Sequence, residues 1–411
     1  MSIFRCNSVS FLIISFLLLS PFFDAITGFS ILNGKAEEGY LGSPSQILRI
    51  CFLFFGFFTL TSSLRSIFII ILCYLLILES TIFFWASSIH SFFSGINITT
   101  KILFAYLFYA VLSSAIELHK ISITKILNIY YISAFLYSVG VIFPFILGIG
   151  ASSYTEGTFG TKGFFASGNA LSPYLGVASS LLLLKKNKSL FMKFIFLFIL
   201  ITLILLGTKA SLFFLIINIY IYISIISPIK RRFFLFFVFV LFFYIDWNKI
   251  YEMISEMHSI ILYRYQNSSN ILSFILSGRD IYVRDAFKEL MLSNIFYFRL
   301  LLGGGALLSF RTQNLENIVL GDTLETDLFD ILFMYGFVGV VIYIFIIIKI
   351  FYFTFYLRTF SFFVFIAFFI HSIFAGHILF NGMSIVSGII LYIFVKERGK
   401  YIENYYHFSW K

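Results

Sequence analysis

A few cations and one amide stand at breaks between long apolar runs. They are Lys162, Asn169, Lys209, Arg264 and Arg279. The guanidinium of Arg279 beside a helix start, with Arg264 upstream, would suit a diphosphate, because its fork geometry matches phosphate oxygens and the helix amino terminus adds a favourable dipole. Ordinary roles stay open beside this chemistry. Lys209 fits a snorkelling lysine that anchors a helical hairpin, Asn169 fits a helix cap, and the arginines fit lipid-headgroup binding.

Three carboxylates, Glu325, Asp327 and Asp330, lie where the chain returns from a polar segment to an apolar run. On a helix, Asp327 and Asp330 share a face, whereas Glu325 and Asp327 point apart. An acid near a hydroxyl nucleophile can act as a general base. Acids at the start of a helix also serve as ordinary caps, so both interpretations stay open.

The composition indicates what must position these side chains. Hydrophobic residues make up 60% of the 411 residues and charged residues 12%, and the mean hydropathy is +0.99. Such a chain has lipid as its main solvent. The apolar runs are continuous rather than alternating, which favours helices over a transmembrane barrel. We therefore expect an all-α polytopic membrane protein.

About twelve transmembrane helices are expected from the apolar runs. They are 8–27, 47–61, 66–86, 102–118, 126–148, 168–184, 190–207, 212–228, 233–247, 328–350, 359–379 and 383–395. Basic clusters mark the short loops at every second turn, and the positive-inside rule then places both termini in the cytoplasm. The first run follows Arg5 and lacks a small-residue cleavage site, which predicts a retained signal anchor.

We expect residues 1–411 to form one integral membrane domain with a single long loop, 248–327, outside the cytoplasm. Within this loop, 280–298 is predicted to be an amphipathic helix on the membrane surface, with Val283, Phe287, Leu290 and Met291 on its apolar face. The net charge of +10 is spread among the short loops, so no nucleic-acid partner is expected. The spacing of the three cysteines does not suggest a metal site, and no cofactor is predicted.

Five short segments follow one another in an informative order. They are 163–169, 206–211, 264–279, 302–305 and 325–339. Together they resemble the O-antigen polymerase and O-antigen ligase superfamily of bacterial envelope glycosyltransferases, over roughly residues 150–345. Ligases usually have arginine where this chain has Lys209, and His-Asn where it has Glu325 and Thr326. Polymerases are more variable at the second position and are therefore the better match.

The resemblance implies a metal-independent transferase in the bacterial inner membrane, with the long loop in the periplasm. It would move a glycan from a polyprenyl-diphosphate carrier to a sugar hydroxyl of a lipid-linked repeat unit. Glu325 would be the catalytic base, and Lys209 and Arg279 would stabilise the diphosphate. The expected substrate-binding residues are Arg264, Asn169, Asp327 and Lys162. Expected partners are the lipid-linked oligosaccharide, membrane lipid, a chain-length regulator and a flippase.

Three other hypotheses remain. An O-antigen ligase is the nearest, because it shares the same order of segments. A lipid-linked oligosaccharide flippase or other transporter also fits about twelve spans. Transporters usually carry polar residues near the middle of the membrane, whereas the longest polar segment of this chain, with nearly half of its acidic side chains and several of its arginines, is the external loop 248–327. A structural membrane partner without activity is the third hypothesis.

Overall fold

The computed structural model describes residues 2–34, 42–86, 89–153, 160–185, 188–225, 265–266, 279–292, 296–308, 324, 326–356, 360–376 and 378–409. The first half contains α1 (Ser2–Leu32), α2 (Pro44–Thr59), α3 (Ser62–Ala86), α4 (Ile89–Glu117), α5 (Ile123–Ile146), β1 (Ala151–Ser152), β2 (Thr161–Gly163), α6 (Gly168–Leu184), α7 (Leu190–Leu206) and α8 (Lys209–Ile225). The second half contains α12 (Arg279–Leu292), α13 (Phe296–Leu302), α14 (Gly305–Leu308), α15 (Asp327–Tyr356), α16 (Ser361–Ala375) and α17 (Gly382–Ser409). The described part of the chain is thus mainly helical, as expected.

The apolar runs coincide with these helices. Each predicted span falls on a described helix except 233–247, which lies outside the described residues. Within the described residues, five helical stretches are long and apolar enough to cross a membrane: Ser8–Leu32, Ser62–Ser80, Gly95–Glu117, Ile123–Ile146 and Asp327–Phe355. Five further apolar helices are shorter, with 10–17 residues. An all-α membrane protein follows, and the number twelve stays a prediction.

The outward faces of the helices are strongly apolar. Phe11 is 72% exposed, Ile70 67%, Ile77 65% and Phe345 65%. Bundles that stand in water rarely present such a continuous apolar surface, because each exposed side chain of this kind loses roughly 1.5–3 kcal/mol relative to burial. These faces are suited to contact with lipid acyl chains.

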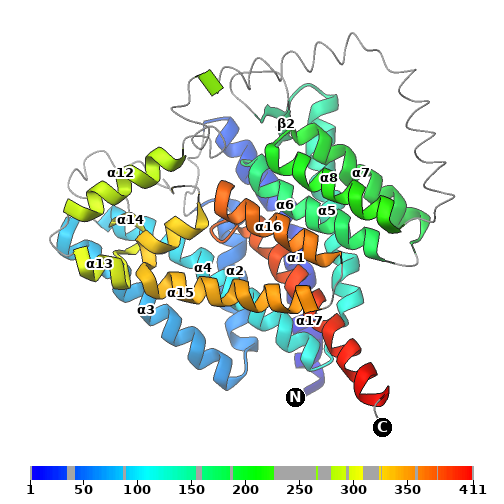
Figure 1. Cartoon of the computed structure of the whole chain (residues 1–411), viewed down its shortest axis with the longest axis horizontal. Helices are drawn as coiled ribbons and strands as arrows, with labels where there is room; N and C mark the ends of the chain where they lie inside the picture. The colour runs from blue at the N-terminus through cyan, green and yellow to red at the C-terminus, as the bar shows by residue number, and fades with distance from the viewer. Residues whose placement is uncertain are drawn as a thin grey trace.

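Helix α6 forms the centre of the bundle and packs against α5, α7, α8, α16 and α17 (Figure 1). Its small residues allow close helix approach, because a Cβ on Gly176 would overlap the ring of Phe214 in α8. The amide of Asn218 in α8 donates to Ser179 over 2.9 Å, and Ser180 donates back to it over 3.1 Å. These bonds satisfy polar groups between two otherwise apolar helices.

The two chain ends lie together at the lower edge of Figure 1, and the β1–β2 hairpin and α12 lie toward the upper edge. We call the first end the terminal end and the second the hairpin end. At the terminal end, the Ser10 hydroxyl donates to the Lys120 carbonyl over 2.9 Å, and Lys396 in α17 forms a 2.9 Å ion pair with Glu117 in α4. Lys120 of the α4–α5 connection therefore lies at the same end of the bundle as both termini.

Helix α4 begins earlier than predicted, because residues 89–100 were expected to form a loop and instead belong to the helix. The polar side chains that suggested a loop are bonded inside the protein. The Gln46 side chain donates to Asn97 over 2.5 Å and to Thr100 over 2.8 Å. Polar residues with such partners are tolerated within a helix that packs against its neighbours.

The predicted amphipathic helix 280–298 is divided into α12 and the start of α13. Leu290 of α12 is buried with Leu324 and Phe333, and Val283 and Phe287 pack against the same cluster. Met291, expected on this face, is 68% exposed. The start of α15 therefore covers the apolar face, which corrects the expectation that this face lies on the membrane surface.

The turn between α13 and α14 packs against a kink in α15. Gly336 has φ 62° and ψ −165° inside α15, and Gly303 in the turn has φ 89°. A Cβ at Gly336 would overlap the Leu301 carbonyl, and one at Gly303 would overlap the Met334 carbonyl. Glycine is therefore required on both sides of this contact.

The carboxylate of Glu79 in α3 is fully buried and binds the backbone just after this turn. It accepts the Ala306 backbone N–H of α14 over 3.0 Å and the Thr99 hydroxyl of α4 over 3.4 Å. A Cβ at Gly95 of α4 would overlap this carboxylate. The glycine-rich turn before Ala306 is buried, and the hydrogen bond from the Ala306 N–H ties it to α3.

Candidate functional site

The residues before α6 form a compact cover over the hairpin end. Strands β1 and β2 pair antiparallel with Ala151 opposite Gly163. Phe165 is buried on the ring of Tyr137 in α5, with centroids 5.3 Å apart. Lys162 is half-buried, and its Nζ donates to the Ala166 carbonyl over 2.8 Å. This hydrogen bond holds the Lys162 ammonium at the hairpin end and stabilises the loop between β2 and α6.

Asn169 is the second residue of α6, and Ser167 caps the helix instead. The Ser167 side chain accepts the Ala170 N–H over 3.3 Å, which corrects the interpretation of Asn169 as a cap. Asn169 is half-buried. Its side-chain amide makes no hydrogen bond to the residues that the structure describes.

Lys209 is the first residue of α8 and is exposed. The preceding turn matches the predicted hinge, because Gly207 has φ 60° and ends α7. The Thr208 hydroxyl accepts the Ser211 N–H over 3.1 Å, which caps α8. The helix dipole disfavours a cation at a helix amino terminus. Neither the dipole nor the Thr208 cap therefore explains why a lysine occupies position 209.

The hairpin, the start of α6 and the α7–α8 turn contact one another. Ser153 donates to the Leu206 carbonyl over 2.7 Å, and the hydroxyls of Ser172 and Thr208 lie 2.8 Å apart. A Cβ on Gly168 would come within 3.2 Å of the Thr208 methyl group. The structure therefore brings together the three segments that carry Lys162, Asn169 and Lys209.

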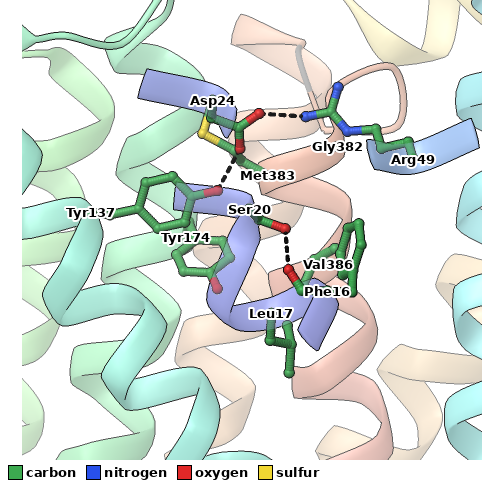
Figure 2. A pocket seen from close by; sticks show the side chains of 10 residues that line it. All are labelled: Phe16, Leu17, Ser20, Asp24, Arg49, Tyr137, Tyr174, Gly382, Met383 and Val386. Carbon is green, nitrogen blue, oxygen red and sulfur yellow. Dashed lines mark hydrogen bonds and ion pairs between the residues drawn. The ribbon is translucent and has the colours of Figure 1, made fainter. Parts of the chain in front are cut away.

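Directly beneath the hairpin lies a buried ion pair between Asp24 of α1 and Arg49 of α2. Arg49 Nη2 donates to Asp24 Oδ1 over 2.9 Å, and the side chains are only 14% and 8% exposed. The Tyr137 hydroxyl donates to Asp24 Oδ2 over 2.5 Å. Figure 2 shows the Asp24 carboxylate between Tyr137 and Arg49. The pair therefore joins α1, α2 and α5.

The surroundings of the pair are tight. A Cβ on Gly382, at the start of α17, would overlap the Arg49 guanidinium, and Gly382 lies beside Arg49 in Figure 2. The adjoining cavity has a volume of about 10 Å³, roughly the room that one water molecule needs. One turn beyond Asp24, a Cβ on Gly28 would overlap the Phe164 carbonyl of the cover. The pair and the cover thus form one packed unit.

Arg49 keeps donors for another partner. A guanidinium carries five N–H donors, and the one hydrogen bond that Arg49 makes with described residues goes to Asp24. Neither Asp24 nor Arg49 is among the candidate residues that the sequence indicates. A signal was present, since an acid and a base in two predicted spans mark a functional or structural pair.

Arg279 is the first residue of α12 and is 9% exposed. The described packing of α12 is with α13 and with the cluster at the start of α15. Arg279 therefore lies on a different element from the Lys162, Asn169 and Lys209 segments. Glu325 and Arg264 lie outside the described residues.

The carboxylates of Asp327 and Asp330 are already engaged inside the protein. Asp327 Oδ2 accepts the Ser372 hydroxyl over 2.5 Å and the N–H groups of Ile378 and Leu379 over 3.3 and 3.4 Å. Asp330 accepts two N–H groups from the segment just before α15. These bonds tie α15 to the α16–α17 connection. A substrate role for Asp327 would require that arrangement to open.

No protein-family model, curated protein or solved structure matches the chain. Within the described residues, no group of three or more His, Cys, Asp or Glu side chains is arranged to hold a metal ion. The site is therefore defined by its own geometry. It consists of two lysines and a half-buried amide at the hairpin end, above a buried ion pair.

Proposed function

We propose that this protein is an O-antigen or capsular polysaccharide polymerase of the bacterial inner membrane. It transfers a glycan from a polyprenyl-diphosphate carrier to a sugar hydroxyl of a lipid-linked repeat unit at the periplasmic face. The proposal includes about twelve spans, cytoplasmic termini and a periplasmic loop 248–327. The observation that carries it is the packing of the Lys162, Asn169 and Lys209 segments into one surface at the hairpin end.

The proposed reaction needs positive charge on the leaving group and a base on the nucleophile. The bond between the sugar anomeric carbon and the diphosphate oxygen breaks, and a bond from the acceptor hydroxyl oxygen to that carbon forms. Lys209 and Arg279 stabilise the departing diphosphate. Glu325 takes the hydroxyl proton. Asn169, Lys162 and Arg264 bind the two substrates, whose lipid tails rest on the apolar exterior.

A transporter of lipid-linked oligosaccharide is the second candidate, and one observation favours it. Asp24, Arg49 and Glu79 are buried charged residues within helices, whereas the sequence had suggested that charges concentrate in the long loop. Ionisable groups at such positions often mark a transport path. The ion-paired and hydrogen-bonded contacts of Asp24, Arg49 and Glu79 equally suit a structural role.

The deciding experiment deletes the gene and resolves the surface glycan and the lipid-linked intermediates. A polymerase leaves single repeat units attached to the core, and a ligase leaves polymer on its lipid carrier without attachment. A flippase leaves repeat units on the cytoplasmic leaflet. The proposal fails if long chains persist at normal length.

Variants then test the surface at the hairpin end. We expect Lys209→Gln to shorten or abolish long chains and Lys209→Arg to retain them, because the arginine keeps a cation beside the diphosphate. Lys125→Gln is the matched control, since Lys125 is also an exposed lysine near a helix start and lies at the terminal end. Equal chain lengths in all three strains would remove Lys209 from the site.

A further inference from the structure

A second pocket lies at the terminal end, far along the bundle from the hairpin. It has a volume of about 320 Å³ and opens between the first turns of α5, the last turns of α6 and the polar half of α17. Its polar lining includes Asn128, Tyr131, Lys185 and Arg398. Leu184 and Phe394 belong to its apolar wall. This volume is within the range of small-ligand pockets.

Two cations line this pocket, Lys185 and Arg398, and neither forms an ion pair with another described residue. Lys185 Nζ donates to the neutral Asn128 side chain over 2.9 Å. The Arg398 guanidinium lies over the Phe394 ring, 4.6 Å from its centroid. By contrast, Lys396 on the same helix is neutralised by Glu117. Glu397 also lines the pocket, so the lining carries two positive charges and one negative charge.

Two further lysines, Lys188 and Lys193, follow Lys185 closely in the sequence and add positive charge to this end. Burial lowers the pKa of Lys188, three residues after Lys185, and the nearby Lys193 lowers it further. Burial also lowers the pKa of Arg398, although a guanidinium stays charged at any physiological pH. Half-buried cations in such a setting are stabilised by an anion that enters the pocket.

We propose that this pocket binds the phosphate-bearing headgroup of an anionic phospholipid. Lys185 and Arg398 contact the phosphate oxygens, and the hydroxyl of Tyr131 and the amide of Asn128 lie within the same lining. The apolar wall of Leu184 and Phe394 suits the glycerol and upper acyl carbons. Basic pockets between membrane helices bind anionic headgroups in this manner. The site does not depend on the proposed transferase activity.

The test uses the purified full-length protein in detergent, titrated with phosphatidylglycerol or phosphatidylcholine of identical acyl chains and followed by native mass spectrometry. We expect phosphatidylglycerol to bind at least about tenfold more tightly, a difference of about 1.4 kcal/mol. Raising the salt concentration should narrow that difference. Equal binding of the two lipids by the wild-type protein would overturn the proposal.

Variants locate the binding. The double variant Lys185→Gln/Arg398→Gln should lose the preference, whereas Lys185→Arg/Arg398→Lys should keep it, because both charges remain. Lys125→Gln is the matched control, because this exposed lysine near the start of α5 does not line the pocket. An unchanged preference in the double glutamine variant overturns the proposal. Complete displacement of the lipid by inorganic phosphate also overturns it, since the ligand would then be the free anion.

Discussion

The buried ion pair between Asp24 and Arg49 permits a prediction with a worked magnitude. Arg49→Met removes the guanidinium and leaves the Asp24 carboxylate among apolar helices, with the Tyr137 hydroxyl still donating to it. Removing one partner of a buried pair typically costs about 3–5 kcal/mol. We expect about 3 kcal/mol, the lower end of that range, because Tyr137 remains and the cavity has room for roughly one water molecule.

The double variant Asp24→Leu/Arg49→Met separates the two possible causes of that loss. It removes both charges, so no unpaired charge remains in the bundle. Replacing both members of a buried pair by apolar groups is often neutral or stabilising. We therefore expect the double variant to be more stable than Arg49→Met alone, although it lacks two wild-type side chains instead of one.

Thermal unfolding of the purified full-length protein in one detergent, followed by circular dichroism, measures these differences. A loss of 3 kcal/mol should lower Tm by roughly 3–4 °C for a chain of this size. Lys125→Met is the control, because it removes an exposed cation without a buried partner. The reasoning is refuted if Arg49→Met melts with the wild type, or if the double variant is no more stable than Arg49→Met.

Three further predictions concern other contacts. Gly95→Ala should destabilise the protein by about 1–3 kcal/mol in the same melting assay, since its methyl group overlaps the buried Glu79 carboxylate; a wild-type Tm would contradict this overlap. Ser372→Ala should cost about 1–3 kcal/mol by removing a donor from Asp327, and Ser372→Thr should cost less if the hydroxyl is what matters. In cells, Lys209→Gln should shorten the glycan whereas Lys209→Arg should not, and equal gel ladders would contradict a role for the charge.

The apolar runs predicted most of the helices because hydropathy reports directly on the solvent of each segment. The prediction failed at the start of α4, where Asn97 and Thr100 suggested a loop. Their partner is the Gln46 side chain on α2. Such pairing between distant helices cannot be read from local sequence, so polar residues satisfied inside a bundle look like loop residues.

The site was predicted in part for a similar reason. Turn chemistry is local, so the hinge before Lys209 and a helix start near Asn169 were both visible in the sequence. The partners of Asp327 are 45 to 52 positions away along the chain, and only the packing of α15 against α16 and α17 reveals them. The Asp24–Arg49 pair likewise depends on how α1 meets α2.

The contacts around Asp24 and Arg49 also bear on the choice between surface chemistry and transport. A transport path through this region would need room for a glycan beside the two charges. The described residues leave a cavity of only about 10 Å³ there, and the close approach of Phe164 to Gly28 closes it from the hairpin end. A polymerase instead needs a rigid support beneath its site, which fixes Lys162 and Lys209 at the surface. The tightly packed Asp24–Arg49 pair supplies that support. For this reason the polymerase remains the preferred proposal.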